Sequence, residues 1–182
     1  MKRTVLLVLG VLAVSTSGFA QTTAETIERA LAAAPRQMKE GAAVIKWKAD
    51  YTYETLKPGT NRMACYDRSG EPGQQPFAVQ CTSVANLPRV AQNRKFEAMS
   101  DKTARQAALD AAEKDGTRVK PEYGSVWLTM NGPDQAHARI HTTIAVPGAT
   151  TQSTGLPDNN KQGGVWIMNA GTTTAHLMTP GS

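Results

Sequence analysis

Two stretches of the chain share one pattern, and this internal repeat limits the possible folds more than any other feature. Residues 124–137 read GSVWLTMNGPDQAH, and residues 163–176 read GGVWIMNAGTTTAH. The first glycine, the Val-Trp pair, a second glycine and the Ala-His pair occupy the same places without a gap. An apolar run around a tryptophan, a glycine-containing turn and a return segment are typical of a β-hairpin. We therefore expect two hairpins that form the main sheet, with the upstream segments packing on it or extending it.

The amino terminus has the pattern of an export signal. A basic start at Lys2 and Arg3 precedes an apolar run over residues 5–14 and a small-residue cleavage site. A membrane anchor is the alternative, but the run is too short to span a hydrocarbon core of about 30 Å. No cysteine follows the cleavage region, which argues against a lipoprotein. We predict a signal peptide over residues 1–20 and one periplasmic or secreted domain, without a transmembrane anchor, over residues 21–182.

The predicted mature domain is only mildly basic. Removal of residues 1–20 leaves eighteen Lys and Arg against fifteen Asp and Glu, a net charge of +3. The basic residues are scattered and form no stripe interleaved with aromatic residues. Binding to nucleic acid or anionic lipid is therefore not expected, and an envelope protein or a small ligand is the more plausible partner.

The chain contains two cysteines, Cys65 and Cys81. In an exported chain, one pair of cysteines is most simply explained as one disulfide. A reactive or metal-binding pair would favour C-x-x-C spacing or a nearby histidine, and the sequence has neither. We predict a structural disulfide that stabilises the fold by about 3 kcal/mol in the chain-entropy model.

The remaining segments alternate between strand and helix patterns. The patterns predict strands at 45–50, 51–56, 63–66 and 138–146, and helical spacing predicts helices at 24–33, 87–99 and 101–114. Residues 77–81 predict a short strand or the entry to a helix. The charges of the later helices are interpreted as a solvated face. Residues 147–162 are rich in Gly, Pro, Thr and Asn and predict a long mobile loop. Strands with inserted helices indicate an α+β fold with an antiparallel sheet of hairpins and helices packed on it.

Two motifs resemble a family of small exported bacterial proteins. The chain reads KPGTNRMAC at residues 57–65, and GGVWIMNAG followed by AHLMTP at residues 163–180. The family is similar in its Gly-Thr-Asn…Cys stretch and its Gly-x-Trp-Ile-Met…Ala-His-Leu-Met-x-Pro carboxyl end. Its members often have Gly-Pro-His in the penultimate hairpin, whereas here Pro133 is separated from His137. The resemblance implies export and this architecture; it implies neither an activity nor a role for His137.

The chain has three histidines, His137, His141 and His176. His137 and His141 lie four residues apart in a predicted strand, about 13 Å at 3.3 Å per residue, which is too far to share one ion. His137 and His176 occupy equivalent places in the repeat and could bind a divalent metal ion if the hairpins lie side by side. Asp134 or Asp158 would then be a third ligand. The alternative is that both histidines are structural and cap hairpin strands.

No motif of an enzyme nucleophile, a phosphate-binding loop or an H-E-x-x-H zinc site occurs in the sequence. The carboxylates show no spacing that requires acid–base chemistry. We therefore predict no catalytic residue and no cofactor other than the metal ion considered above. Trp127 and Trp166 could stack in the core, or they could line an exposed face for sugars or peptides. Their apolar neighbours favour the core.

The sequence thus favours an exported, non-catalytic binding or structural module. One alternative is a small metal-assisted hydrolase that uses His137 and His176. A second alternative is an envelope assembly factor that contacts a protein partner through residues 147–162.

Overall fold

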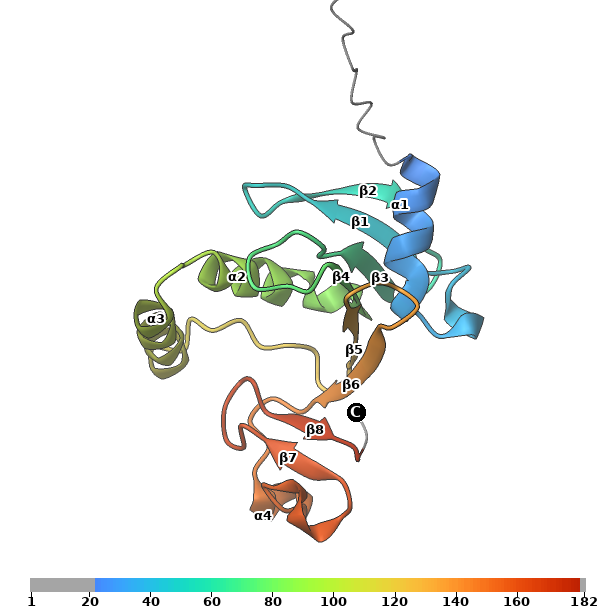
Figure 1. Ribbon diagram of the computed structural model, residues 1–182. Coiled ribbons are helices and arrows are strands. Elements are labelled where there is room, and N and C mark those ends of the chain that lie inside the picture. Colours follow the sequence, from blue (N-terminus) through green and yellow to red (C-terminus); the bar gives the residue numbers. More distant parts are fainter. Residues whose placement is uncertain (1–21, 181–182) are drawn as a thin grey trace, which may run out of the picture.

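Within residues 22–180, which the computed structural model describes, eight strands form one mixed, mostly antiparallel sheet. The predicted signal peptide, residues 1–20, lies outside the described residues. The strands are β1 (Ala43–Trp47), β2 (Tyr53–Lys57), β3 (Met63–Asp67), β4 (Phe77–Ser83), β5 (Val126–Gly132), β6 (Arg139–Ala145), β7 (Trp166–Met168) and β8 (His176–Met178). Their order is β2-β1-β3-β4-β5-β6-β8-β7, and β1 and β3 form the parallel pair (Figure 1).

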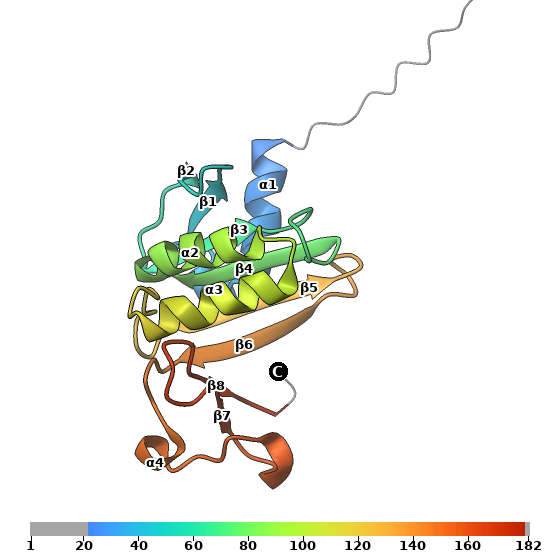
Figure 2. The same ribbon diagram turned by 90° about the vertical axis from the view of Figure 1, so that its left-hand side faces the viewer.

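Helices lie on both faces of this sheet (Figures 1 and 2). They are α1 (Thr23–Ala30), α2 (Leu87–Glu97), α3 (Lys102–Lys114) and α4 (Thr151–Thr154), with 3-10 turns η1 (Leu31–Ala33), η2 (Arg36–Met38), η3 (Val84–Asn86) and η4 (Asn160–Gln162). α1 and η1 cover one face, α2 covers the other, and α3 packs beside α2. The predicted α+β fold is therefore confirmed. None of the helices within residues 22–180 is long and apolar enough to cross a membrane.

The larger core lies under α1 and contains the disulfide. Ala30 and Ala33 pack against Val44, Val79 and other buried residues of β1, β3, β4 and β5. α1 begins with a capping box, in which the Thr22 hydroxyl accepts a hydrogen bond from the backbone of Glu25. Small alanines let this helix and η1 approach the sheet closely.

The predicted disulfide between Cys65 and Cys81 is confirmed. The two residues are direct partners in the antiparallel pair of β3 and β4, with a Cα–Cα distance of 4.1 Å. Both are fully buried. The bond is consistent with an oxidising compartment. Its burial makes it a structural link between strands and not a reactive site.

A second, smaller core lies between α2 and the opposite face of the sheet. Leu87 and Val90 of α2 pack on Ile45, Ala64 and Tyr66. The Tyr66 hydroxyl donates a hydrogen bond to Oε1 of Gln80 at 2.6 Å. Burial also raises the pKa of Tyr66, so this phenol stays protonated. Tyr66 and Gln80 are cross-strand partners and project from the same face of the sheet. This face therefore carries polar side chains next to the apolar residues at its centre.

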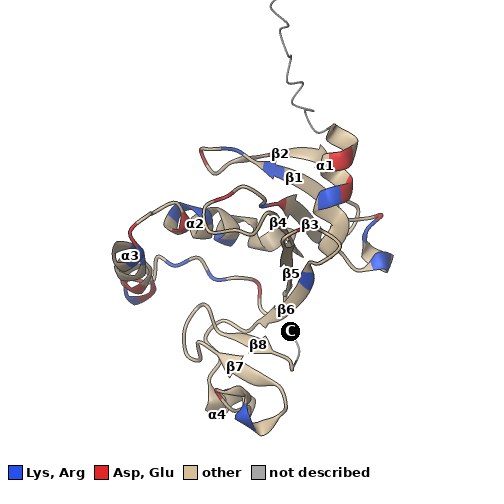
Figure 3. Ribbon diagram, viewed as in Figure 1, with Lys and Arg blue, Asp and Glu red and all other residues tan. Residues whose placement is uncertain are grey.

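Charged residues are concentrated away from the carboxyl-terminal hairpins. In Figure 3 the blue and red residues lie mainly on the helices and the first strands, whereas β7 and β8 are uncharged. From residue 123 to residue 180 the charged residues are Asp134, Arg139, Asp158 and Lys161. The blue residues in this view are spread over several elements.

Both copies of the repeat form hairpins, and they join side by side through β6 and β8. The strands upstream extend the same sheet beyond β5, as expected. One detail was wrong: the return strand of the first hairpin begins at Arg139, so His137 lies in the turn. Residues 147–162 were expected to be a loop, but they contain α4 and η4. Ala149 in this segment packs against Ile167 in a third, small apolar cluster.

Candidate functional site

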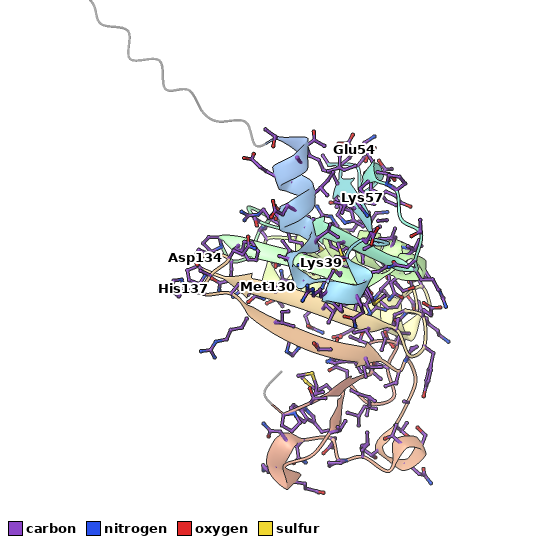
Figure 4. The ribbon with its side chains drawn as sticks, turned by 90° about the vertical axis from the view of Figure 1, so that its right-hand side faces the viewer. Lys39, Glu54, Lys57, Met130, Asp134 and His137 are labelled. Carbon is purple, nitrogen blue, oxygen red and sulfur yellow. A yellow bond between two sulfur atoms is a disulfide. The ribbon has the colours of Figure 1, made fainter. Side chains whose placement is uncertain are left out.

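The structure does not bring the predicted metal-binding histidines together. His137 lies in the turn between β5 and β6, where its Nδ1 is 2.8 Å from Oδ1 of Asp134 (Figure 4). His176 is the first residue of β8 and pairs with Ala145, the last residue of β6. The two histidines therefore lie at opposite ends of β6. At 3.3 Å per residue, this separates them by about 25 Å.

Neither histidine is part of a larger ligand cluster. Within residues 22–180, no group of three or more His, Cys, Asp or Glu side chains could hold a metal ion. The hydrogen bond from the His137 side chain lowers the pKa of Asp134, and both side chains are exposed. Asp158 instead accepts a hydrogen bond from the Asn159 side chain. Because protein metal sites usually have three or four ligands, the structure gives no support to a shared ion.

The two tryptophans of the repeat also lie apart. Trp127 pairs with Thr143, Thr143 pairs with Met178, and Met178 pairs with Trp166. Both rings thus lie on the same face of the sheet, with β6 and β8 between them. The expected stacking is wrong because the hairpins join through their return strands. Trp127 instead packs, half-buried, against the α2 core.

Trp127 and His176 line one cavity between α2 and the sheet, which we call the α2 pocket. Its volume is about 170 Å³, and its lining includes Gln80, Arg89, Trp127, Thr129, Thr143 and His176. Strand register explains this set. Gln80 pairs with Thr129, Trp127 pairs with Thr143, and His176 pairs with Ala145. Cross-strand partners project from the same face of a sheet, so four strands contribute side chains to one concave surface.

Arg89 of α2 is the buried charge of this pocket, with only 3% of its surface exposed. Its guanidinium donates hydrogen bonds to Thr173 Oγ1 at 3.0 Å, to Thr174 Oγ1 at 2.8 Å and to the carbonyl of Val119. Its Nε donates to Asn93 Oδ1. All four acceptors are uncharged, and within residues 22–180 no carboxylate forms an ion pair with Arg89.

A second buried arginine adds to the positive charge around the pocket. Arg118 donates hydrogen bonds to the side chains of Gln92 and Asn93, and its guanidinium lies 5.1 Å from the centre of the Phe96 ring. Burial, followed by the charge of Arg118, lowers the pKa of Arg89 to about 10. Arg89 therefore remains cationic at neutral pH.

Glu113 of α3 provides a negative charge that acts on both arginines, but it forms an ion pair with neither. It accepts hydrogen bonds from the backbone and the hydroxyl of Thr173. Burial raises the pKa of Glu113, and these hydrogen bonds together with the charge of Arg89 outweigh that effect and lower it. Arg118 and Glu113 do not line the α2 pocket, in which Arg89 is the charged side chain.

His176 offers the pocket a nitrogen that can bind a ligand. Its Nδ1 lies 2.7 Å from the carbonyl oxygen of Thr174. Because a carbonyl only accepts hydrogen bonds, Nδ1 must carry a proton in this arrangement. Nε2 takes no part in the contact with Thr174. The pocket therefore combines a buried cation, an aromatic wall, three threonine side chains, two amides and an imidazole.

Comparisons with models of protein families, with curated proteins and with solved structures found no match to the chain. The geometry of the pocket is therefore the basis for a functional assignment.

Trp127 and His176 were candidate site residues from the sequence, whereas Arg89 was not. The charges of α2 were interpreted as a solvated face, yet Arg89 is buried. The partners of Arg89 are Thr173 and Thr174, which lie 84 and 85 residues further along the chain. No local pattern indicates such a contact.

Proposed function

We propose that the protein is an exported, non-catalytic binding module that holds a small anionic ligand in the α2 pocket. The observation that carries this proposal is the buried guanidinium of Arg89, which has only uncharged hydrogen-bond acceptors. Burying a charge is unfavourable unless it is paired, and arginine binds carboxylate or phosphate groups through parallel N–H donors. A bound anion would supply the missing counter-charge.

The size and lining of the pocket limit the ligand further. A volume of about 170 Å³ is below the range of about 300–1,000 Å³ that is usual for drug-sized ligands. The pocket therefore suits a small carboxylate or phosphate compound, with Trp127 against its apolar part. The hydroxyls of Thr129 and Thr143 are placed to orient its polar atoms.

The two alternative functions have less support. A metal-assisted hydrolase would need His137 and His176 together, and they lie at opposite ends of β6. An assembly factor would need a recognition surface in residues 147–162, and no specific observation favours one. Export itself is supported by the signal pattern of residues 1–20 and by the disulfide, which is consistent with an oxidising compartment.

Thermal unfolding with a set of small ions tests the proposal. The oxidised protein would be unfolded with acetate, lactate, succinate, phosphate and sulfate, and separately with choline chloride as a control for ionic strength. A ligand that binds only the folded state raises the unfolding midpoint in proportion to the logarithm of its concentration. We expect one class of anion to do so well below 10 mM, an order-of-magnitude limit set by the few contacts that so small a site can make.

Variants test whether the increase in the unfolding midpoint depends on the α2 pocket. Arg89→Lys keeps the charge but loses the planar fork, and Thr129→Val removes one lining hydroxyl. Both variants should bind the anion about tenfold more weakly, which is the effect of losing one charge-assisted contact. Arg62→Lys is the matched control, because its side chain is 77% exposed and does not line the pocket. An equal response in all four proteins would contradict the proposal.

A further inference from the structure

A second cavity lies against α2, and different residues of that helix line it. Its volume is about 510 Å³, and its lining includes Trp47, Tyr51, Tyr53, Val84, Leu87 and Pro88. We call it the aromatic groove. Trp47, Tyr51 and Tyr53 come from the β1–β2 hairpin, and Pro88 belongs to α2. Arg89 and Asn93 of α2 line the other cavity, so the two sites share no side chain.

The groove is aromatic and uncharged. It contains three of the seven Trp and Tyr residues of the chain, and no Lys, Arg, His, Asp or Glu lines it. The rings of Trp47 and Tyr53 are 5.4 Å apart and nearly perpendicular, so they present a ridge and not a flat platform. Tyr53 is 43% exposed and Val84 is 42% exposed. These apolar surfaces are accessible to a ligand.

Tyr51 adopts a backbone conformation that tyrosine rarely has. Its φ of 66° is left-handed, a conformation that favours glycine. The turn is closed by hydrogen bonds from the backbone and hydroxyl of Thr52 to Asp50, so the conformation is fixed by its neighbours. A glycine would suit this turn better. Tyrosine instead places a ring at the groove, and local strain of this kind is often found at binding sites.

Trp47 contributes its ring and not its indole N–H to the groove. The nitrogen is buried, so a ligand in the groove does not reach it. The ring lines the groove beside Tyr53 and is supported from below by an edge-on contact with Tyr66.

We propose that the aromatic groove binds a proline-rich peptide in the polyproline II conformation, with an acidic residue beside the prolines. Such peptides dock on aromatic ridges, and their carbonyl groups accept hydrogen bonds from tyrosine hydroxyls. The acidic residue is argued from Lys95 of α2, whose Nζ lies 5.7 Å from the centre of the Tyr51 ring and places a positive charge at the rim.

The lining argues against other ligands. A sugar needs several polar side chains to bond its hydroxyls, whereas here the polar groups are the Thr52 hydroxyl and the tyrosine hydroxyls. A charged small molecule would need a counter-charge inside the groove, and no lining residue supplies one. The proposed peptide site is independent of the α2 pocket, because a negative binding result at one site does not affect the proposal for the other.

Fluorescence anisotropy with labelled peptides tests this inference on the oxidised protein. The probe is a fluorescein-labelled peptide of one aspartate followed by nine prolines. The comparison peptides replace the aspartate with lysine, or replace the prolines with alternating glycine and serine. We expect saturable binding of the aspartate–proline peptide, weaker binding of the lysine form and no binding of the glycine–serine form. A linear glucose oligomer is added as an unlabelled competitor and should not displace the probe.

Variants locate the binding. Tyr53→Ala should weaken binding at least about tenfold, as expected for an aromatic anchor, and Trp47→Phe should weaken it less, because an aromatic ring remains at the position. Tyr123→Ala is the control, since Tyr123 is 68% exposed and lies outside the groove. Cooperative thermal unfolding of each variant would show that it is folded. The inference fails if the proline peptide does not bind, if folded Tyr53→Ala binds it as well as the original chain does, or if the sugar displaces it.

Discussion

Trp127 and His176 occupy non-equivalent positions of the two repeats, yet they line the same pocket under α2. The equivalent positions, His137 and His176, are instead separated by the length of β6. This follows from how the hairpins join, because β6 and β8 pair at only one end of β6. Residues at equivalent positions of the two sequence repeats therefore do not lie at equivalent places in the fold.

Removal of the disulfide should destabilise the fold without affecting either proposed site. The double variant Cys65→Ala, Cys81→Ala should lose about 2–4 kcal/mol of unfolding free energy, because the unfolded chain is no longer constrained. Urea denaturation followed by far-UV circular dichroism measures this. A loss below about 1 kcal/mol would show that the buried strand pairing of β3 and β4 is sufficient without the bond.

Tyr51 should be a position where a glycine stabilises the protein. Its left-handed backbone costs about 1 kcal/mol for a residue with a Cβ atom. Tyr51→Gly should therefore be more stable than Tyr51→Ala by about that amount, because the pair differs only in Cβ. Chemical denaturation of the two variants measures the difference. A glycine variant that is no more stable than the alanine variant would show that the turn holds no strain.

The stability of the protein should depend on Glu113 in a defined pH range. The folded state lowers its pKa below the ordinary value of 4.5, so the native state favours the ionised form. This contribution is fully present above the unfolded pKa and is lost as the pH falls through the lower folded pKa. Unfolding free energies from pH 7 to pH 2 should therefore decline less steeply below about pH 4.5 in Glu113→Gln, a limit set by the reference pKa of glutamate. A parallel decline in both proteins would contradict this assignment.

Divalent metals should not link His137 and His176. Thermal unfolding with zinc, copper, manganese or calcium is compared with chelator-treated protein, in the original chain and in His137→Ala and His176→Ala. Because the histidines are about 25 Å apart along β6, we expect no stabilisation that requires both. A metal-dependent increase in the unfolding midpoint that each single variant abolishes would contradict the observed strand register.

Much of the fold could be predicted from local pattern. The repeated Val-Trp and glycine spacing predicted both hairpins, and the helical spacing of residues 24–33 predicted α1. The two cysteines, alone in a chain that we expect to be exported, predicted the disulfide. These features depend on neighbouring residues or on a single possible pairing, and so a sequence is sufficient to find them.

The candidate sites could not be predicted in this way. Arg89 is buried by residues 119, 173 and 174, which only the complete fold brings beside α2. The aromatic groove needs the β1–β2 hairpin to lie against Pro88. The predicted stacking of Trp127 and Trp166 was wrong because it assumed neighbouring strands, whereas the sheet order places β6 and β8 between them.

In the proposed function, Arg89 binds an anion that the protein itself does not supply. Isothermal titration of the oxidised protein with the anion that raises its unfolding midpoint most tests this directly, with Arg89→Lys titrated in parallel. We expect one saturable site in the original chain and an affinity at least about tenfold weaker in the variant, in keeping with the loss of one charge-assisted hydrogen bond. Equal affinity in the two folded proteins, or no saturable binding of any small anion, would contradict it.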